Sequence, residues 1–327
     1  MTSRRILVPL VLVAAIISLA YASLAIGSFD AAPSNVLSAL QGGDGSFTVA
    51  RLRLPRMVLA VLVGACLGLA GTVFQTLLSN PLASPDLIGV SQGASAAAVG
   101  AILLGGLSGA AVSLLAFTGA VAVALLITLL SWRHGISSYR FVLIGIGIAF
   151  VVQAFLGYLL TRADVRDAQA ALVWLVGSIA TPRWDEIGVT ALLAAVLALA
   201  LLPLAPKLRM LQLGDDAATG LGVAVTRSRI LLTLVAVGFA AVAVAVAGPV
   251  LFVAFVAGPI ARRVTHSSGA ALVTSALVGT VVVLAADFLG QRAIPDVRVP
   301  VGVVTSLVGA PYLLWLLARD NRSRGSL

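Results

Sequence analysis

Long uncharged runs alternate with short polar segments along the whole chain. Residues 57–78 form the clearest run, which contains no charged side chain. A helix rises 1.5 Å per residue and needs about 20 apolar residues to cross a bilayer, so this run predicts a transmembrane helix. Gly64, Gly68 and Gly71 recur within it at helical spacing. Small residues in such a row let a neighbouring helix approach closely.

The same pattern repeats to the end of the chain and predicts an all-α integral membrane protein with about ten transmembrane helices. The predicted spans are 6–27, 57–78, 88–106, 108–131, 140–161, 187–206, 228–247, 250–264, 270–289 and 300–318. Residues 1–327 would then form a single polytopic domain. The segment 168–180 is apolar but too short to span, and we expect it to lie at the membrane surface with Trp174 at the headgroup level.

Composition excludes a soluble protein, because 60% of the residues are hydrophobic and only 10% are charged. Soluble domains carry about 25% charged residues. The first run follows Arg4 and Arg5 and is open to two interpretations. It is either an uncleaved first helix or a signal peptide cleaved after 20–22. Its length exceeds that of a typical signal sequence and favours the uncleaved helix.

The net charge of +9 is explained by where the basic residues lie relative to the membrane. With both termini in the cytoplasm, thirteen of the 21 basic residues fall inside, as the positive-inside rule expects of a protein of the cytoplasmic (inner) membrane. They are Arg4, Arg5, Arg133, Arg140, Lys207, Arg209, Arg227, Arg229, Arg262, Arg263, Arg319, Arg322 and Arg324. The excess positive charge would face anionic lipid headgroups, so membrane lipid and not nucleic acid is the expected partner.

Ionisable groups are almost absent from the predicted spans, where Asp287 is the single acid. Ion-coupled carriers usually keep acids or histidines at mid-membrane, whereas His134 and His266 fall in loops. This disfavours a self-sufficient secondary carrier. An intramembrane enzyme is disfavoured too, since Cys66 is the one cysteine and no acids pair at depth. We therefore predict no catalytic residue, metal site or cofactor in this chain.

Several longer motifs resemble one transporter family. They are RLPR at 53–56, GACLGLAG at 64–71, NPLASPDLIGVSQGA at 80–94, LGDDAATGLGV at 213–223, AGPVLFVAFVAGPIARR at 247–263, AADFLG at 285–290 and PVGVVTSLVGAPYLLWLL at 300–317. Together with Gln75 they are similar to the FecCD family, the permease subunits of type II ABC importers for iron-siderophores, haem and cobalamin. Segments 132–148 and 214–232 resemble most the second permease of ferric-enterobactin importers, which serve a catecholate siderophore.

The resemblance implies a machine of several subunits. Two permeases, identical or paralogous, would surround a central pathway, and two cytoplasmic ATPase subunits would bind ATP and magnesium. An extracytoplasmic siderophore-binding protein would deliver the substrate. This chain itself has no G-x-x-x-x-G-K-[ST] motif for binding ATP. The implied function is import of a ferric siderophore, with cobalamin or haem as the alternative cargo.

The resemblance also assigns ATPase coupling to the cytoplasmic loop at about 207–227. The residues concerned are Leu213, Gly214, Asp215, Asp216, Ala217, Ala218, Gly220, Leu221 and Gly222. From residue types alone, Gly214 can end one helix and Asp215 or Asp216 can cap the next. Residues 217–221 would then form a short helix that Gly222 stops. Such a compact knob suits a groove on an ATPase.

Arginines at the outer face are the candidates for docking the binding protein. Arg53 and Arg56 match family arginines that pair with its glutamates, although snorkelling to lipid headgroups is the alternative. Arg292 is a weaker third candidate, because Gln291 stands at the matching position. Two other departures are Arg298, where the family has a glutamate, and the missing histidine after Pro259.

Two polar features near the second span complete the prediction. Gln75 either lines the pathway or bonds to a neighbouring helix. The span ends at residues 80–81, because Pro81 removes a backbone donor and disfavours helix at the preceding residue. Asp86 is expected to cap the third span, and a second ATPase contact is the alternative role of this turn.

Overall fold

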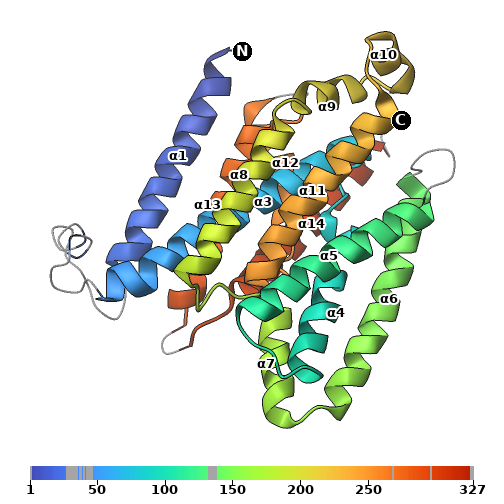
Figure 1. Ribbon diagram of the computed structural model, residues 1–327. Helices are drawn as coiled ribbons and strands as arrows, with labels where there is room; N and C mark the ends of the chain where they lie inside the picture. Colours follow the sequence, from blue (N-terminus) through green and yellow to red (C-terminus); the bar gives the residue numbers. More distant parts are fainter. Residues whose placement is uncertain are drawn as a thin grey trace.

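The computed structural model describes residues 2–26, 36, 39, 41, 47–131, 138–266, 269–294 and 297–324, and these ranges contain helices and no β-strand (Figure 1). The helices are α1 (Thr2–Ala25), the π-helix η1 (Phe47–Arg53), α3 (Leu54–Leu77), the 3-10 helix η2 (Pro85–Ile88), α4 (Val90–Leu103), α5 (Ala110–Ser131), α6 (Ser138–Arg162), α7 (Val165–Val176), α8 (Trp184–Leu201), α9 (Ala205–Leu211), α10 (Asp215–Gly220), α11 (Val225–Ala247), α12 (Val253–Thr265), α13 (Leu272–Arg292) and α14 (Val301–Arg324).

Seven of the predicted spans are confirmed as helices long and apolar enough to cross a membrane. They are Ile6–Ala25, Phe47–Leu77, Ala110–Ser131, Val142–Arg162, Trp184–Leu201, Val225–Ala247 and Leu272–Arg292. The predicted span at 300–318 falls within the 24-residue helix α14, whose apolar part is Val301–Trp315. The predicted spans at 88–106 and 250–264 correspond to shorter helices, α4 with 14 residues and α12 with 13. At 1.5 Å per residue such helices cover only about 20 Å, so the count of ten full spans is an approximation.

The expectation that 168–180 lies along the membrane surface is wrong. Helix α7 stands upright beside α4 and α6 (Figure 1). Its Ala171 is buried in one cluster with Val99 of α4 and Leu159 of α6, and Trp174 packs against the main core. Helix α7 is thus a packed member of the bundle, held by contacts with α4 and α6.

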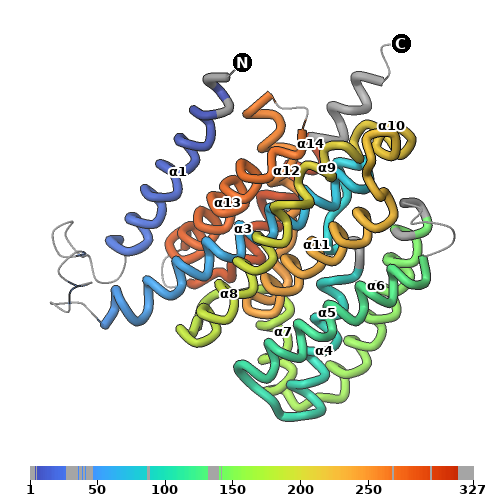
Figure 2. The backbone as a smooth tube through the Cα atoms, turned by 45° about the horizontal axis from the view of Figure 1, so that its top comes forward, coloured from blue at the N-terminus to red at the C-terminus, as the bar shows by residue number. Residues whose placement is uncertain are grey.

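Helix α3 runs through the middle of the bundle, with α11, α12 and α13 packed around it (Figure 2). Its row of small residues faces these neighbours, as the spacing predicts. A Cβ atom on Gly68 would lie 2.3 Å from the Ser275 carbonyl oxygen of α13, and one on Gly71 would lie 1.8 Å from the Ala254 carbonyl oxygen of α12. The backbones therefore touch where no side chain intervenes.

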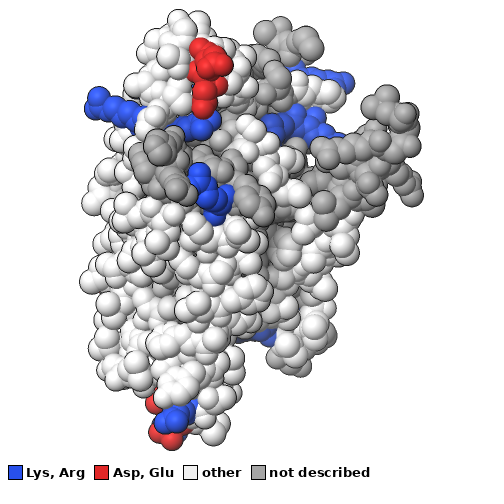
Figure 3. Space-filling model, turned by 90° about the vertical axis from the view of Figure 1, so that its right-hand side faces the viewer, with Lys and Arg blue, Asp and Glu red and all other residues white. Residues whose placement is uncertain are grey.

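Charged residues gather at the two ends of the bundle. On the face shown in Figure 3, blue and red side chains lie near the top and the bottom with an uncharged band between them. The N-terminal end of α1 and the short helices α9 and α10 lie at the same end (Figures 1 and 2), where the C-terminus is also marked in Figure 1. We call it the α10 end.

Replacing Gly71 with Ala tests the close packing of α3. The added methyl group would overlap the Ala254 carbonyl oxygen, and we expect a loss of about 1–3 kcal/mol in the free energy of unfolding, measured by SDS titration in mixed micelles. Gly147→Ala in α6 is the matched control, because nothing lies within 4 Å of its Cβ position. Equal stability of the two variants would contradict the packing described above.

Candidate functional site

A small helical knob projects from the bundle at the α10 end (Figure 1). It consists of α9, α10 and the turns at 212–214 and 221–224. The Leu213 and Leu221 side chains are 65% and 58% exposed, while Ala218 is fully buried. The knob therefore presents apolar side chains beyond the membrane-spanning part of the bundle, and exposed apolar groups in such a place are typical of protein contacts.

Two glycines shape the knob. Gly214 has φ +98° and Gly222 has φ +81°, and residues with a Cβ rarely adopt such angles. Helix α10 spans Asp215–Gly220, so it begins two residues earlier than predicted and ends before Gly222.

The predicted aspartate cap of α10 is wrong, because Gly214 occupies the N-cap position. Asp215 and Asp216 lie in the first helical turn, where a carboxylate stabilises the positive end of the helix dipole. The Asp215 carboxylate accepts a hydrogen bond of 2.7 Å from the Arg229 guanidinium of α11. This ion pair joins the knob to the base of a long core helix.

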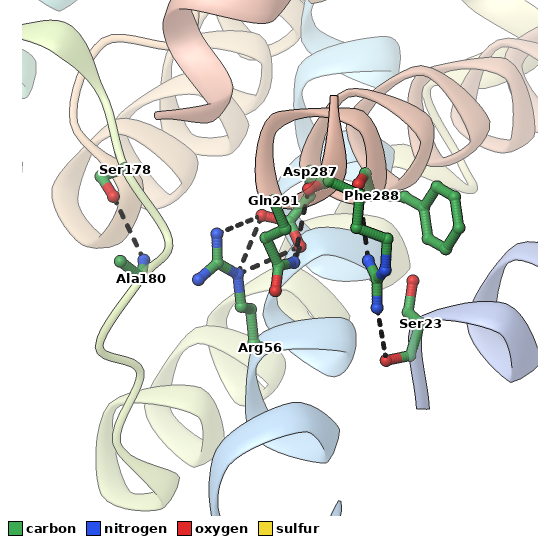
Figure 4. Close-up of polar contacts among 8 residues, drawn as sticks. Ser23, Arg56, Ser178, Ala180, Asp287, Phe288 and Gln291 are labelled. Carbon is green, nitrogen blue, oxygen red and sulfur yellow. Dashed lines mark hydrogen bonds and ion pairs between the residues drawn. The ribbon is translucent and has the colours of Figure 1, made fainter. Parts of the chain in front are cut away.

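At the opposite end of the bundle, Arg56 of α3 forms an ion pair with Asp287 of α13 (Figure 4). Arg56 Nη2 and Nε donate to Asp287 Oδ1 at 2.7 and 2.9 Å, and Nε also donates to Oδ2 at 3.1 Å. Gln291 Nε2 donates to Oδ2 at 2.6 Å. The side chains of Arg56 and Asp287 are only 12% and 5% exposed. The single acid of the predicted spans is thus fully engaged.

The two other candidate arginines hold the end of α1. Arg53 Nη1 donates to the Leu24 carbonyl oxygen at 2.6 Å. Arg292 Nη2 contacts the carbonyl oxygens of Ser23 and Ile26, and its guanidinium lies 4.2 Å from the ring of Phe288. Cations are favourable at a helix C-terminus, where carbonyl groups lack helical partners.

All three predicted docking arginines therefore contact their own chain in this structure, and docking stays a prediction. The pairing of Arg56 with Asp287 was missed at the level of sequence, because the partners lie 231 residues apart. The sequence singled out Arg56 as a docking candidate and Asp287 as the one acid of the predicted spans. Only the packing of α3 on α13 shows that the two form a pair.

Gln75 connects α3 to α12 within the bundle. Its side chain is 3% exposed, and Nε2 donates to the Phe255 carbonyl oxygen at 2.9 Å. That carbonyl lacks its helical donor, because residue 259 is a proline without N–H. Arg262 Nη2 in turn donates to Gln75 Oε1 at 2.9 Å. Gln75 thus makes the bond to a neighbouring helix, which was one of its two predicted roles.

Three further motif positions, 86, 260 and 298, lie in different environments. Ile260, next to Pro259 where the family histidine is missing, is partly buried in a cluster with Leu12 of α1. Gly89 and not Asp86 is the N-cap of α4, and the Asp86 carboxylate accepts a hydrogen bond from the Ser91 hydroxyl. Burial raises the pKa of this carboxyl, and the bond from Ser91 opposes the rise. Arg298 is exposed.

Some predicted features lie outside the described residues. Arg133 and His134 fall within 132–137, and the side chains of Arg5, Arg319, Arg322 and Arg324 are likewise not described.

The model of the FecCD transport family matches residues 12–319. The chain belongs to the FecCD transport family. It is 39% identical over 326 residues to the ferric enterobactin transport system permease protein FepG of Escherichia coli (strain K12), covering 98% of this chain and 99% of that one. It is 37% identical over 325 residues to the Fe(3+)-citrate import system permease protein YfmE of Bacillus subtilis (strain 168), covering 98% and 97%.

The fold agrees with this membership. A solved structure described as a metal-chelate type ABC transporter in an inward-facing conformation superposes with a TM-score of 0.81. It is 26% identical and covers 96% of this chain and 99% of its own. This FecCD chain is therefore a non-catalytic, multi-pass permease subunit of an ABC importer.

Removing the acid of the buried ion pair tests its role in this FecCD permease. Asp287→Leu leaves Arg56 buried without its carboxylate, and we expect a loss of about 3–5 kcal/mol in the free energy of unfolding. The double variant Arg56→Leu/Asp287→Leu should recover part of that loss, because no buried charge is left unpaired.

The matched control is Asp185→Leu. Its pair with Arg183 has both side chains more than 60% exposed (64% and 61%), so no change in stability is expected. A double variant that is no more stable than Asp287→Leu alone would show that the ion pair does not act as described.

Proposed function

We propose that this chain forms part of the pathway by which a ferric siderophore of the catecholate class crosses the cytoplasmic (inner) membrane. The observation that carries the proposal is the full-length similarity to a ferric enterobactin permease, at 39% identity. A second permease, identical or paralogous, would complete the pathway. ATP and magnesium would bind to two partner ATPase subunits and not to this chain.

The α10 end would face the cytoplasm and the ATPase subunits, so both termini would lie in the cytoplasm. Support comes from the described basic residues at the ends of helices there, which include Arg140, Lys207, Arg227 and Arg263 and follow the positive-inside rule. Leu213 and Leu221 of the knob would enter a groove on an ATPase. The Arg229–Asp215 ion pair would pass a displacement of the knob to α11.

The opposite end would receive the siderophore-binding protein. Arg53 and Arg292 donate to neutral carbonyl groups of α1, and hydrogen bonds to a carboxylate are stronger than these. A glutamate on the binding protein would therefore compete for both arginines. Arg56 is already paired with an internal carboxylate and is mostly buried, so its share in docking would be the smallest of the three.

Uptake by the reconstituted transporter tests the cargo. The chain is purified through an affinity tag with its partner subunits and placed in liposomes with the loaded binding protein. We expect ATP-dependent uptake of radiolabelled iron as its enterobactin chelate and no uptake of labelled cobalamin or haem. Uptake of cobalamin or haem alone would refute the siderophore, and iron uptake without nucleotide would refute the coupling to ATPase subunits.

Gly222→Ala tests the coupling role of the knob. A residue with a Cβ at φ +81° costs about 1–2 kcal/mol, so the turn that holds Leu221 should shift. We expect the stimulation of ATPase activity by loaded binding protein to fall several-fold while the permease stays inserted and assembled.

Gly188→Ala in α8 is the control for this change. Gly188 lies outside the knob, its φ is not positive, and nothing lies within 4 Å of its Cβ position. This variant should keep wild-type stimulation. If Gly222→Ala also keeps it, the knob does not couple the ATPase to transport.

A further inference from the structure

A cavity of about 380 Å³ lies between α4, α6, α7 and the turn after α11. Four polar side chains line it, namely Ser91, Gln92 and Ser95 from α4 and Gln153 from α6, and Leu175 and Pro249 lie on its wall as well. None of the described residues that line it is charged. The cavity is partly open to the surface of this single chain, next to α6.

Polar groups in this position need an explanation. Gln153 lies inside the candidate span Val142–Arg162, and its side chain is exposed. An amide that faced lipid there would lose its hydrogen bonds to water without gaining others. The Gln153 amide is therefore unsuited to contact with lipid chains, whereas Ile146 and Phe150 beside it on α6 are apolar and exposed.

The wall also contains an acceptor without a partner. Among the described residues, Gln92 Oε1 is buried and receives no hydrogen bond. Buried polar atoms in native proteins are nearly always bonded to protein or water. Ser95 is buried beside it and turns a further hydroxyl toward the same space. These groups together call for water or a polar ligand in the cavity.

A second cavity differs from this one in its lining. It lies between α12, α13 and α14, measures about 90 Å³ and is lined by Phe252, Val256, Leu289 and other apolar residues, with Thr305 as its polar member. Such a space suits a hydrocarbon chain or stays empty. This second cavity has no amide side chain among its described lining residues, in contrast to the cavity between α4, α6 and α7.

We propose that the cavity between α4, α6 and α7 is a water-filled section of the transport pathway, in which the Ser95 hydroxyl and the amide N–H groups of Gln92 and Gln153 donate hydrogen bonds to the oxygen atoms of a passing metal chelate, while Gln92 Oε1 accepts a hydrogen bond from water. This inference rests on the proposed function, because it names the residues that the imported chelate touches. The open side of the cavity is closed by the second permease. A neutral wall that offers hydrogen bonds but no cation holds an anionic chelate weakly, which allows it to leave.

Accessibility to a water-soluble thiol reagent tests the pathway directly. The single native cysteine, Cys66, is 2% exposed and is replaced by Ala. Ser95→Cys and Gln153→Cys are then made separately in the complete transporter, in liposomes, and treated with a membrane-impermeant methanethiosulfonate. Ser95→Cys changes one atom and preserves the fold even if the larger change at Gln153 does not.

Leu192→Cys in α8 is the control, because Leu192 lies in another candidate span and is 65% exposed but lines neither cavity. We expect both pathway cysteines to react at least tenfold faster than Leu192→Cys, and added ferric chelate with its binding protein to slow them. Reaction as slow as that of Leu192→Cys at both positions would overturn the proposal.

Transport by the Gln153→Leu variant gives a second measurement. Loss of one hydrogen bond to the chelate should lower the uptake rate about fivefold, whereas Leu192→Val should keep the wild-type rate. Unchanged uptake by both Gln153→Leu and a Gln92→Leu variant would also overturn the proposal.

The failure of this inference can be told from a failure of the proposed function. If the wild-type transporter imports no iron chelate, the proposed function is wrong whatever the cysteines show. If it imports the chelate but neither pathway cysteine reacts with the reagent, only the assignment of the pathway is wrong.

Discussion

Helix α3 can occupy the centre of the bundle only because several of its residues lack a side chain. Gly68 and Gly71 bring its backbone into contact with carbonyl groups of α13 and α12. In lipid there is little hydrophobic drive between helices, so close van der Waals packing supplies much of their association. The contacts that connect α3 to its neighbours, including those of Arg56 and Gln75, depend on this short separation.

Polar groups at depth follow the rule that the bilayer offers them no water. Asp287 is surrounded by Arg56 and Gln291, and Gln75 supplies the donor that Pro259 removes from α12. Both arrangements join separate helices. Among the described residues, they leave no ionisable group at depth poised to transfer a proton. The cavity beside Gln153 is different, since Gln92 Oε1 in its wall is buried and receives no hydrogen bond from the described residues.

The two ends of the bundle are built for different contacts. At the α10 end, a rigid knob with exposed leucines is tied to α11 through Asp215 and Arg229. At the other end, Arg53 and Arg292 hold the carbonyl groups of α1 by bonds that a carboxylate could replace. An importer needs such an asymmetry, because one face receives substrate and the other receives the energy of ATP hydrolysis.

Hydrophobic runs and their glycine spacing were enough to predict the membrane class, seven spans and the small-residue face of α3, because these features repeat locally along the helix. The motifs around 213–223 also identified the family and the knob. The amino-acid sequence did not show that Arg56 meets Asp287, that Gln75 meets the carbonyl freed by Pro259, or that α7 stands upright against α4. Those facts depend on which helices pack together, and residues far apart in the chain become neighbours only in the tertiary structure.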